Sequence, residues 1–526
     1  MKVLVKDKIA DTGIDMLKKH FDVDVKQEWT QDEMKAHIKD YDAVIVRSAG
    51  KMTEDIINEA DNLKIIGRAG IGLDNVDIEA ATRRGIIVAN APQSNIVSAA
   101  EHAIALMLAQ ARRIPEADKS LKGGEWKRSK LEGVEIYDKT LGIVGLGRIG
   151  SLVASRAKGL GMKVIAFDPY VASDKFDDLN VDMVEDLDDL LKVADFISIH
   201  LPKTPETKGI IGIEQFKKMK DGVRIVNAAR GGIVDEKALY DALKSGKVGG
   251  AALDVFENEP PKDSPLFELD QVVVTPHLGA STSEAQDKAG VMIAEQVIAG
   301  LKGEFVTTAV NISAVPPETA EQIMPFIPLA EVVGSLYSHL AEGKMGAIEI
   351  EYAGQIAAYD IGILTSAVLK GAFTPVSHEP VTFVNAPLMA KDRGIEVREV
   401  KTPKSREYTS LITIKSHNKH DISVSGTLGG TKNEPRIVRI NRFEFDMVPT
   451  KYMALFMYDD KPGVIGAIGT VLGKSNINIG TMQVGREAAK GKALMAVNVD
   501  SEIPESVMDV LRHINDIAMA KYLTLS

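Results

Sequence analysis

The chain has 526 residues, 45% of them hydrophobic and 26% charged, with a formal net charge of -11 and no cysteine. This length predicts about three to four domains, and the composition is that of an ordinary globular protein. The negative charge disfavours nucleic acid as a partner, and the absence of cysteine excludes disulfides. Lys6, Asp7 and Lys8 stand where a signal peptide would be apolar, and no apolar run is long enough to span a membrane, so we expect a cytoplasmic protein.

The first 90 residues alternate short apolar runs with amphipathic stretches, which is typical of an α/β fold. A long apolar helix is predicted next over Asn95–Ala111, between Pro92 and Pro115, and this helix could join two lobes. The strands expected in the first lobe are Val3–Val5, Ala43–Val46, Lys64–Gly67 and Ile86–Ala89.

A second α/β run predicts a doubly wound parallel sheet of the Rossmann type. A helix over Ser281–Leu301 and a β stretch at Thr307–Asn311 would then return the chain to the first lobe, which makes the first domain discontinuous. The strands expected in the second lobe are Leu141–Val144, Lys163–Phe167, Phe196–His200, Arg224–Asn227, Gly250–Val255 and Val272–Thr275.

The regular α/β pattern ends at Pro316 and Pro317, and we expect an α+β intervening domain after them. It contains a helix near Leu329–Glu342 and strands near Ala347–Tyr352 and Tyr408–Ile414. From residue 451 onward the pattern fits a small β-α-β-β-α-β module. The predicted domains are residues 1–93 with 286–312, residues 94–285, residues 313–449 and residues 450–526.

A glycine-rich loop follows the first strand of the second lobe. Gly145, Gly147 and Gly150 have the spacing G-x-G-x-x-G, which lets the backbone approach a pyrophosphate at a helix N-terminus. Asp168 ends the next strand, where a carboxylate accepts hydrogen bonds from ribose hydroxyls and repels a 2′-phosphate. The sequence therefore predicts NAD rather than NADP as the cofactor.

Three polar residues downstream of this loop suit alcohol oxidation, which needs a base for the hydroxyl proton. His277 follows the last predicted strand, at the sheet edge where ligands bind, and histidine serves as a base near neutral pH. Glu259 is predicted to orient this imidazole, and the planar fork of Arg230 matches a carboxylate or an α-keto acid. Most other histidines, His102 among them, are interpreted as structural, and no metal site is predicted.

Five motifs connect the chain to a known family: G-R-A-G-I-G-L-D-N-V-D, G-L-G-R-I-G, N-A-A-R-G-G-I-V-D-E, A-L-D-V-F-E-N-E-P and P-H-L-G-A-S-T. On these motifs the chain resembles NAD-dependent D-2-hydroxyacid dehydrogenases of the long form, with an intervening domain and an ACT-type regulatory domain. The family's catalytic residues match Arg230, Glu259 and His277. The resemblance also implies cofactor contacts from Arg148, Ile149, Pro202, Thr207, Ala228, Arg230, Asp254, His277 and Gly279.

The resemblance implies a substrate with both phosphate and carboxylate: NAD-dependent oxidation of 3-phospho-D-glycerate to 3-phosphooxypyruvate, the first committed step of L-serine biosynthesis. Arg47 and Arg68 each follow an apolar strand, so their guanidinium groups could face the cleft and bind phosphate. Further substrate contacts are expected from the backbone of Gly70, Ile71 and Gly72 and from Asn95.

The C-terminal module is similar to ACT domains that bind L-serine between paired subunits. The matching positions are Tyr458, Asp460 and Asn478, and their chemistry suits an amino acid because Asp460 can meet an ammonium group. A homotetramer with serine feedback is therefore expected.

Three alternatives stay open from the sequence. One is a reductase of glyoxylate, hydroxypyruvate or another 2-oxo acid, which a lack of phosphate preference would indicate. Another is a non-catalytic NAD-sensing regulator on the same fold, against which the intact catalytic trio argues. The third is a serine sensor whose dehydrogenase half is secondary.

Overall fold

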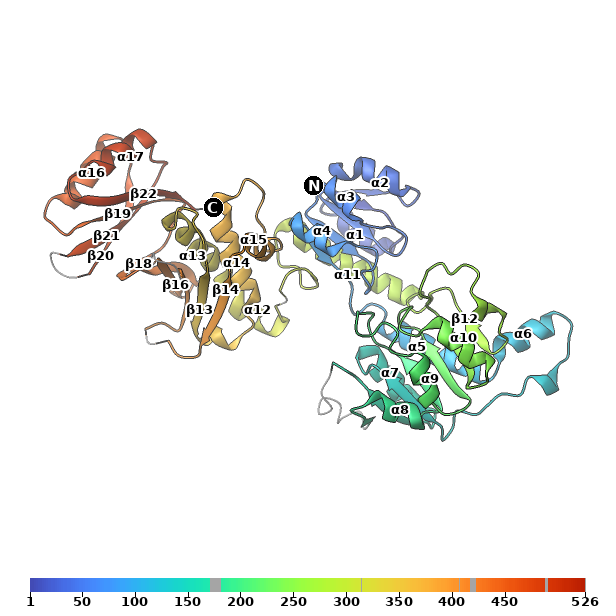
Figure 1. Ribbon diagram of the computed structural model, residues 1–526. Coiled ribbons are helices and arrows are strands. Elements are labelled where there is room, and N and C mark those ends of the chain that lie inside the picture. The colour runs from blue at the N-terminus through green and yellow to red at the C-terminus, as the bar shows by residue number, and fades with distance from the viewer. Residues whose placement is uncertain (171–180, 314, 406, 417–421, 488–490, 526) are drawn as a thin grey trace.

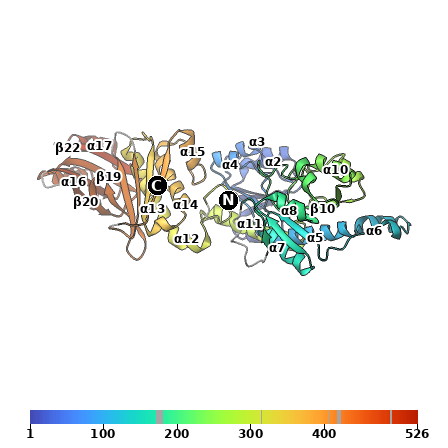
Figure 2. The same cartoon turned by 60° about the horizontal axis from the view of Figure 1, so that its bottom comes forward.

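The computed structural model describes residues 1–170, 181–313, 315–405, 407–416, 422–487 and 491–525. The parts follow one another along an elongated molecule, from the C-terminal module through the intervening domain and the first lobe to the second lobe (Figures 1 and 2). Within these residues, no helix combines the length and the apolar character needed to span a bilayer.

The first lobe is a parallel sheet of five strands in the order β2-β1-β3-β4-β5. Four of its strands were predicted, and β2 (Asp22–Val25) was missed because its D-V-D-V sequence lies at an edge and is only half-buried. The remaining elements are β1 (Lys2–Val5), α1 (Asp11–Lys18), α2 (Gln31–His37), β3 (Ala43–Val46), α3 (Glu54–Asn58), β4 (Ile65–Arg68), α4 (Ile78–Arg83) and β5 (Ile87–Ala89).

After the second lobe, the chain packs against the first sheet again. Helix α11 (Ser283–Lys302) packs against α1 and strand β4, and its Ile293 and Val297 join the core of the first sheet. Residue Ala309 then bridges Ala89 antiparallel. The first lobe is therefore built from two separate stretches of the sequence.

The second lobe is a parallel sheet of seven strands in the order β12-β11-β10-β9-β6-β7-β8. All six predicted strands are present, and the two-residue edge strand β8 (Asp182–Met183) is additional. The others are β6 (Thr140–Val144), β7 (Lys163–Phe167), β9 (Phe196–Ile199), β10 (Val223–Asn227), β11 (Val248–Leu253) and β12 (Val272–Val274), with α7 (Arg148–Gly159), α8 (Leu187–Val193), α9 (Ile213–Lys218) and α10 (Glu236–Lys244).

The predicted long helix is α5 (Ile96–Ala111), which leaves the first lobe and packs against α7, β10 and β11 of the second. It stops at residue 112 because Arg113 takes a left-handed conformation with φ of 53°. The next helix, α6 (Ile114–Lys122), extends away from the body of the lobe (Figure 1).

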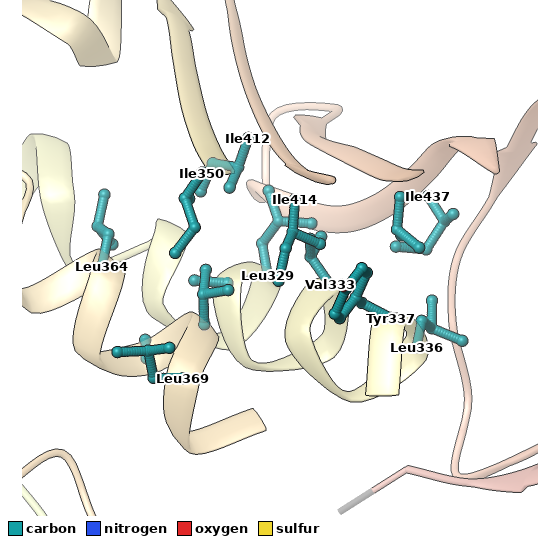
Figure 3. Packing of buried hydrophobic residues seen from close by; sticks show 14 of the residues in the cluster. Leu329, Val333, Leu336, Tyr337, Ile350, Leu364, Leu369, Ile412, Ile414 and Ile437 are labelled. Carbon is teal, nitrogen blue, oxygen red and sulfur yellow. The ribbon is translucent and has the colours of Figure 1, made fainter. Parts of the chain in front are cut away.

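The intervening domain is a mixed six-stranded sheet in the order β14-β13-β15-β16-β17-β18, covered by two packed helices, α13 and α14 (Figure 3). Helix α14 was missed: ten of its twelve residues are buried, so its sequence lacks the polar face that gives a helical period. The elements are α12 (Pro317–Ile323), α13 (Phe326–Leu340), β13 (Ile348–Gly354), α14 (Gly362–Phe373), α15 (Ala386–Asp392), β14 (Val397–Thr402), β15 (Ser410–Ser416), β16 (Ser423–Gly429), β17 (Glu434–Ile440) and β18 (Phe443–Met447).

The C-terminal module has the predicted β-α-β-β-α-β order and forms an antiparallel sheet, β20-β21-β19-β22. Alternate residues of β19 face opposite ways: Ala454 and Phe456 pack on the module's own helices, whereas Met453 and Leu455 join the core of the intervening domain. The elements are β19 (Tyr452–Asp459), α16 (Val464–Lys474), β20 (Ile479–Arg486), β21 (Lys492–Val499), α17 (Glu505–Arg512) and β22 (Ile517–Thr524). The fold class predicted from the sequence is confirmed in all four parts.

Candidate active site

A cleft of about 710 Å³ lies between the two lobes, and the predicted catalytic and substrate residues all line it. The first lobe contributes loops at the carboxyl ends of β3 and β4, and the second lobe contributes loops after β10, β11 and β12. Ligands bind at this end of parallel sheets. The predicted residues in the lining are Arg47, Arg68, Gly70, Ile71, Gly72, Asn95, Arg230, Glu259 and His277.

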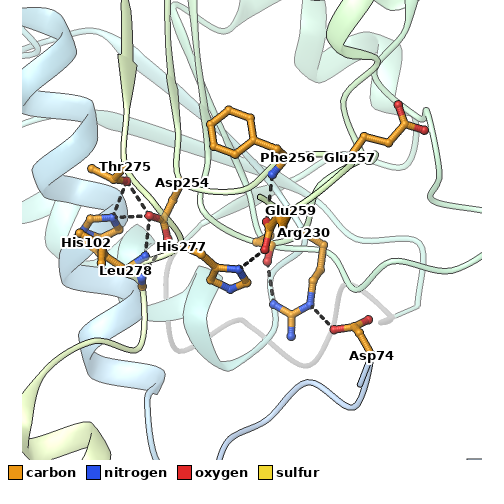
Figure 4. A network of polar contacts seen from close by, with 12 residues as sticks. Asp74, His102, Arg230, Asp254, Phe256, Glu257, Glu259, Thr275, His277 and Leu278 are labelled. Atoms are coloured by element: carbon orange, nitrogen blue, oxygen red, sulfur yellow. Dashed lines mark hydrogen bonds and ion pairs between the residues drawn. The ribbon is translucent and has the colours of Figure 1, made fainter. Parts of the chain in front are cut away.

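His277 and Glu259 form a close pair (Figure 4). The ring Nδ1 of His277 lies 2.7 Å from Oε2 of Glu259, whose Oε1 accepts a hydrogen bond of 3.0 Å from the Phe256 N–H. The bond to Glu259 raises the pKa of His277 above its ordinary value, although burial opposes this. Burial disfavours ionisation of Glu259, but the bonds from His277 and Phe256 prevail and hold its pKa below the usual range. The pair therefore combines a proton carrier with a fixed anion.

Arg230 follows β10 and projects into the same cleft. Its Nη1 donates to the Ala229 carbonyl at 2.7 Å, and the side chain of Asn227 holds its backbone carbonyl at 3.0 Å. Its Nε lies 3.5 Å from Oδ2 of Asp74, a residue of the first lobe with a largely exposed side chain. These contacts fix the backbone and the guanidinium group of Arg230, which lines the cleft.

Arg47 and Arg68 bring two more guanidinium groups to the cleft from the first lobe. The loop after β3 is fixed by buried Asp7, whose carboxylate accepts from the N–H groups of Arg47 at 2.5 Å and Gly50 at 2.8 Å. Burial, together with the positive charge of Arg230, lowers the pKa of Arg68 to about 10. The Nε of Arg68 is buried with no hydrogen-bond partner among the described residues. An anionic ligand would offset the repulsion between Arg68 and Arg230 and would accept a hydrogen bond from Nε of Arg68.

Two arginine side chains pack closely against the loop of residues 70–72. A β carbon on Gly70, which has a φ of 156°, would overlap the Arg68 guanidinium, and one on Gly72 would overlap that of Arg230. Asn95 lies beside this loop at the start of α5, and its Oδ1 is buried without a hydrogen-bond partner among the described residues. A side chain at either glycine would therefore displace one of the two arginines from its present position.

The glycine-rich loop joins β6 to α7 in the way the sequence predicts. Gly145 has a φ of 100° and its α carbon faces the His200 carbonyl, while Gly150 packs against the Gly145 carbonyl. Gly147 has no atom within 4 Å of the place of a β carbon and caps α7 without a side chain. The N–H groups of the first turn of α7 are consequently open to a phosphate.

Asp168 lies at the end of β7, beside this loop. Its Oδ2 accepts from the Leu146 N–H at 2.8 Å and its Oδ1 from the Tyr170 N–H at 2.9 Å. Each carboxylate oxygen keeps a lone pair that can accept from a ribose hydroxyl. These features fit NAD, with the pyrophosphate at α7 and the ribose at Asp168.

The other predicted cofactor residues surround the same crevice or support it. Asp254 ends β11, is fully buried, and accepts from the N–H groups of Leu278 at 2.7 Å and Gly279 at 2.8 Å. Thr207 is also buried, and its hydroxyl donates to the Pro202 carbonyl at 2.6 Å, so it shapes this loop. Arg148 is exposed beside Gly147, Ile149 in the first turn of α7 packs against the apolar core of the second lobe, and Ala228 lies next to Gly279.

Two residues that sequence reasoning missed belong to this region. Asp74 is the ion-pair partner of Arg230. His102, interpreted as structural, places its Nε2 3.1 Å from Oδ1 of Asp254. The signal for His102 was its position on the same face of α5 as Asn95, seven residues earlier.

The predicted effector residues do not meet within one subunit. Tyr458 and Asp460 lie at one end of the C-terminal sheet, where Asp460 is 3.4 Å from Arg486. Asn478 donates to Asp500 at 2.6 Å, at the opposite end of β21. The two groups are separated by most of that strand, roughly 20 Å. A ligand of the size of an amino acid could therefore not contact both groups within one copy of the chain.

Comparison with known proteins identifies the domains. Residues 104–279 match the NAD-binding domain of D-isomer specific 2-hydroxyacid dehydrogenases, residues 322–441 the intervening domain of D-3-phosphoglycerate dehydrogenase, and residues 452–514 the ACT domain.

Full-length relatives agree with these matches. D-3-phosphoglycerate dehydrogenase of Archaeoglobus fulgidus is 45% identical over 100% of both chains, and that of Methanocaldococcus jannaschii is 43% identical over 98% of both. A solved Thermus thermophilus protein superposes on 59% of this chain and 100% of its own with 33% identity and a TM-score of 0.55. A Paecilomyes thermophila glyoxylate reductase covers 61% of this chain and 99% of its own, with 32% identity and a TM-score of 0.54. The chain belongs to the D-3-phosphoglycerate dehydrogenase family of NAD-dependent D-isomer specific 2-hydroxyacid dehydrogenases.

Proposed function

We propose that the protein oxidises 3-phospho-D-glycerate to 3-phosphooxypyruvate with NAD, in the first committed step of L-serine biosynthesis. The observation that carries this proposal is the meeting of three guanidinium groups with the His277–Glu259 pair in one cleft. A substrate with a phosphate at one end and a carboxylate at the other can engage cations from both lobes. The names of the full-length relatives support the same substrate.

Each residue that lines the cleft has a separate role in substrate binding or proton transfer. Arg47 and Arg68, from the first lobe, bind the phosphate, and the N–H groups of residues 70–72 bind the carboxylate. Arg230 holds the oxygen on C2 and stabilises the partial negative charge that develops there. His277 takes the hydroxyl proton on Nε2, because its Nδ1 is engaged by Glu259. Glu259 stabilises the imidazolium that results.

Bound NAD supplies the acceptor for the hydride that leaves C2. The chain would hold it through Gly147, the first turn of α7 and Asp168, with Asp254 and Gly279 at its nicotinamide end. The domain boundaries given by the sequence are part of this proposal, with residues 94–285 carrying the cofactor.

The test is NADH formation with 3-phospho-D-glycerate and with D-glycerate, which lacks the phosphate. Arg47→Ala should raise KM for the phosphorylated substrate by about tenfold or more and leave that for D-glycerate nearly unchanged. The matched control is Arg84→Ala, which removes an arginine of the same lobe that pairs with Asp61 on the surface. Equal kcat/KM for the two substrates in the wild type would reject the proposal.

A reductase of glyoxylate or another small 2-oxo acid is the second candidate, favoured by the similarity to a glyoxylate reductase structure. It predicts NADH consumption with glyoxylate at a higher kcat/KM than with 3-phosphooxypyruvate. Arg47→Ala would then leave activity unchanged.

The proposal includes L-serine as an effector and a homotetramer in the cytoplasm. Helix α6 and the loop after it extend from the second lobe with large exposed apolar side chains: Ile114 is 53% exposed, Leu121 60% and Trp126 81%. Association between copies would bury them. Light scattering of the purified protein gives the subunit number, and adding L-serine to the NADH assay tests inhibition.

A further inference from the structure

The helix that joins the two lobes contacts the loop of residues 275–282, which carries His277. Three polar residues lie along one face of α5: Asn95 at its start, then Ser98 and His102. The hydroxyl of Ser98 lies 2.8 Å from that of Thr282, at the far end of the loop. The Nε2 of His102 lies 3.2 Å from the Thr275 hydroxyl, at its near end. The helix therefore holds the loop at both ends.

His102 reaches His277 through Asp254. Oδ1 of Asp254 lies 3.1 Å from Nε2 of the His102 ring, and the carboxylate accepts from the Thr275 hydroxyl at 2.5 Å and from the N–H groups of Leu278 and Gly279 (Figure 4). The backbone carbonyl of Asp254 accepts from the N–H of His277 at 2.9 Å. One buried residue thus fixes three successive amides of the catalytic loop.

The carboxylate needs these donors because it is fully buried. Burial disfavours the charged form, but the hydrogen bonds from His102, Thr275 and the two amides hold the pKa of Asp254 below its usual range. A carboxylate only accepts, so His102 must present an N–H at Nε2. Of the side chains that donate to Asp254, His102 alone comes from α5 among the described residues.

The loop has a backbone conformation that requires such support. His277 has a φ of 56°, in the left-handed region that a side chain other than glycine rarely adopts. A residue in this region is strained and persists only when contacts from its surroundings hold it there. The hydrogen bonds that Asp254 accepts from the N–H groups of His277, Leu278 and Gly279 hold His277 in this conformation.

We propose that His102 is a positioning residue: by donating to Asp254 it fixes the loop of residues 275–282, and with it His277, relative to the helix that joins the lobes. This role rests on the proposed function for its effect on turnover, but its effect on the loop is independent of any substrate. His102 touches neither substrate nor reacting atoms and acts through Asp254.

The experiment compares two substitutions with a neighbouring control. His102→Leu removes the donor and keeps an apolar side chain, whereas His102→Gln keeps an N–H that reaches the same place. Glu101→Gln is the control, because Glu101 precedes His102 on α5 and pairs with Arg156 on the surface at 3.4 Å. Melting temperatures, amide hydrogen exchange of residues 275–282 without substrate, and kcat with pH are measured for all three.

We expect amide exchange of the loop to become about tenfold faster or more in His102→Leu and to return close to wild type in His102→Gln. We also expect kcat to fall about tenfold in the leucine variant alone, and its rise with pH to begin lower as the His277–Glu259 pair loosens. Wild-type exchange in His102→Leu, or equally fast exchange in both variants, would overturn the inference. Failure of the wild type to oxidise 3-phospho-D-glycerate would reject the proposed function and leave the exchange result to decide this one.

Discussion

The cleft and the C-terminal module differ in how their polar groups are brought together. In the cleft, residues separated by more than 200 positions in the sequence line one space, and the His277–Glu259 and Arg230–Asp74 pairs form within a single subunit. In the module, Asp460 and Asn478 are only 18 positions apart, yet they lie at opposite ends of the sheet. The polar groups of the cleft meet within one chain, whereas those of the module do not.

We therefore expect substitutions in the cleft and substitutions in the C-terminal module to affect activity in different ways. Changes in the cleft should alter turnover in every subunit independently. Changes in the module should leave basal turnover alone and act only when the effector is present and the subunits are paired.

The largest expected effect is that of His277→Ala. Loss of the base should lower kcat by about 10²- to 10⁴-fold, because the imidazole that takes the hydroxyl proton is removed. Steady-state NADH formation measures this loss. The control is His513→Ala, whose ring contacts the Asp509 carbonyl at the end of α17 in the C-terminal module. A comparable loss in both variants would mean that the proton is not transferred at the cleft.

Glu259→Gln should have a smaller effect on kcat, about tenfold, and a diagnostic effect on the pH profile. Oxidation requires neutral His277, so kcat/KM rises with pH through the pKa of that residue. Glu259 raises this pKa, so its removal should move the rise to lower pH. The comparison is Glu257→Gln, two residues away, whose side chain points away from His277 (Figure 4). An unmoved profile in Glu259→Gln would show that another group sets the pH dependence.

Asp74→Asn should change KM by only a few-fold. The carboxylate of Asp74 competes with the substrate for Arg230, so its neutralisation should lower KM about threefold, as expected for an exposed ion pair. Inhibition by inorganic phosphate should strengthen in parallel, which substrate-saturation curves at several phosphate concentrations would reveal. The control is Glu54→Gln, which removes another carboxylate that lines the cleft. Glu54 lies near Arg83 rather than Arg230. A raised KM in Asp74→Asn would mean that Asp74 helps to bind the substrate.

The smallest effect on basal turnover is expected for Asp460→Ala and Asn478→Ala. Each should abolish inhibition by L-serine and leave activity without serine at the wild-type level. Co-expression of the two variants should restore part of the inhibition, because a mixed pair contains one site with both residues intact. Inhibition that stays absent in the mixture would place both residues in the same subunit's site, and inhibition that survives each single substitution would exclude them from it.

The sequence predicted the layered parts of the fold best. Apolar strands such as β3 and β6 are buried on both faces, so their composition alone identifies them. Strand β2 was missed because its alternating charges suit an edge that is only partly covered. Helix α14 was missed for the opposite reason, since burial on all sides removes the polar period.

The candidate site was predictable where a motif carries the chemistry. Arg230, Glu259 and His277 lie in distinct motifs, and the structure places them along one cleft. The contacts of His102 and Asp74 could not be predicted, because they are made with groups that lie far away in the sequence. Asp74 lies inside a quoted motif and His102 on the helix face of Asn95, but neither position identifies its partner. A histidine beside a buried carboxylate is visible only when α5 and β11 are seen together.

The two-sided strand β19 has a consequence for how the molecule can be taken apart. Met453, Leu455, Leu494, Ala496 and Leu523 belong to the same apolar core as the helices of the intervening domain. Cutting the chain near residue 450 would divide this core and expose apolar side chains on each fragment, which favours aggregation. The intervening domain and the C-terminal module should therefore be kept together in any chimera with another two-lobed dehydrogenase.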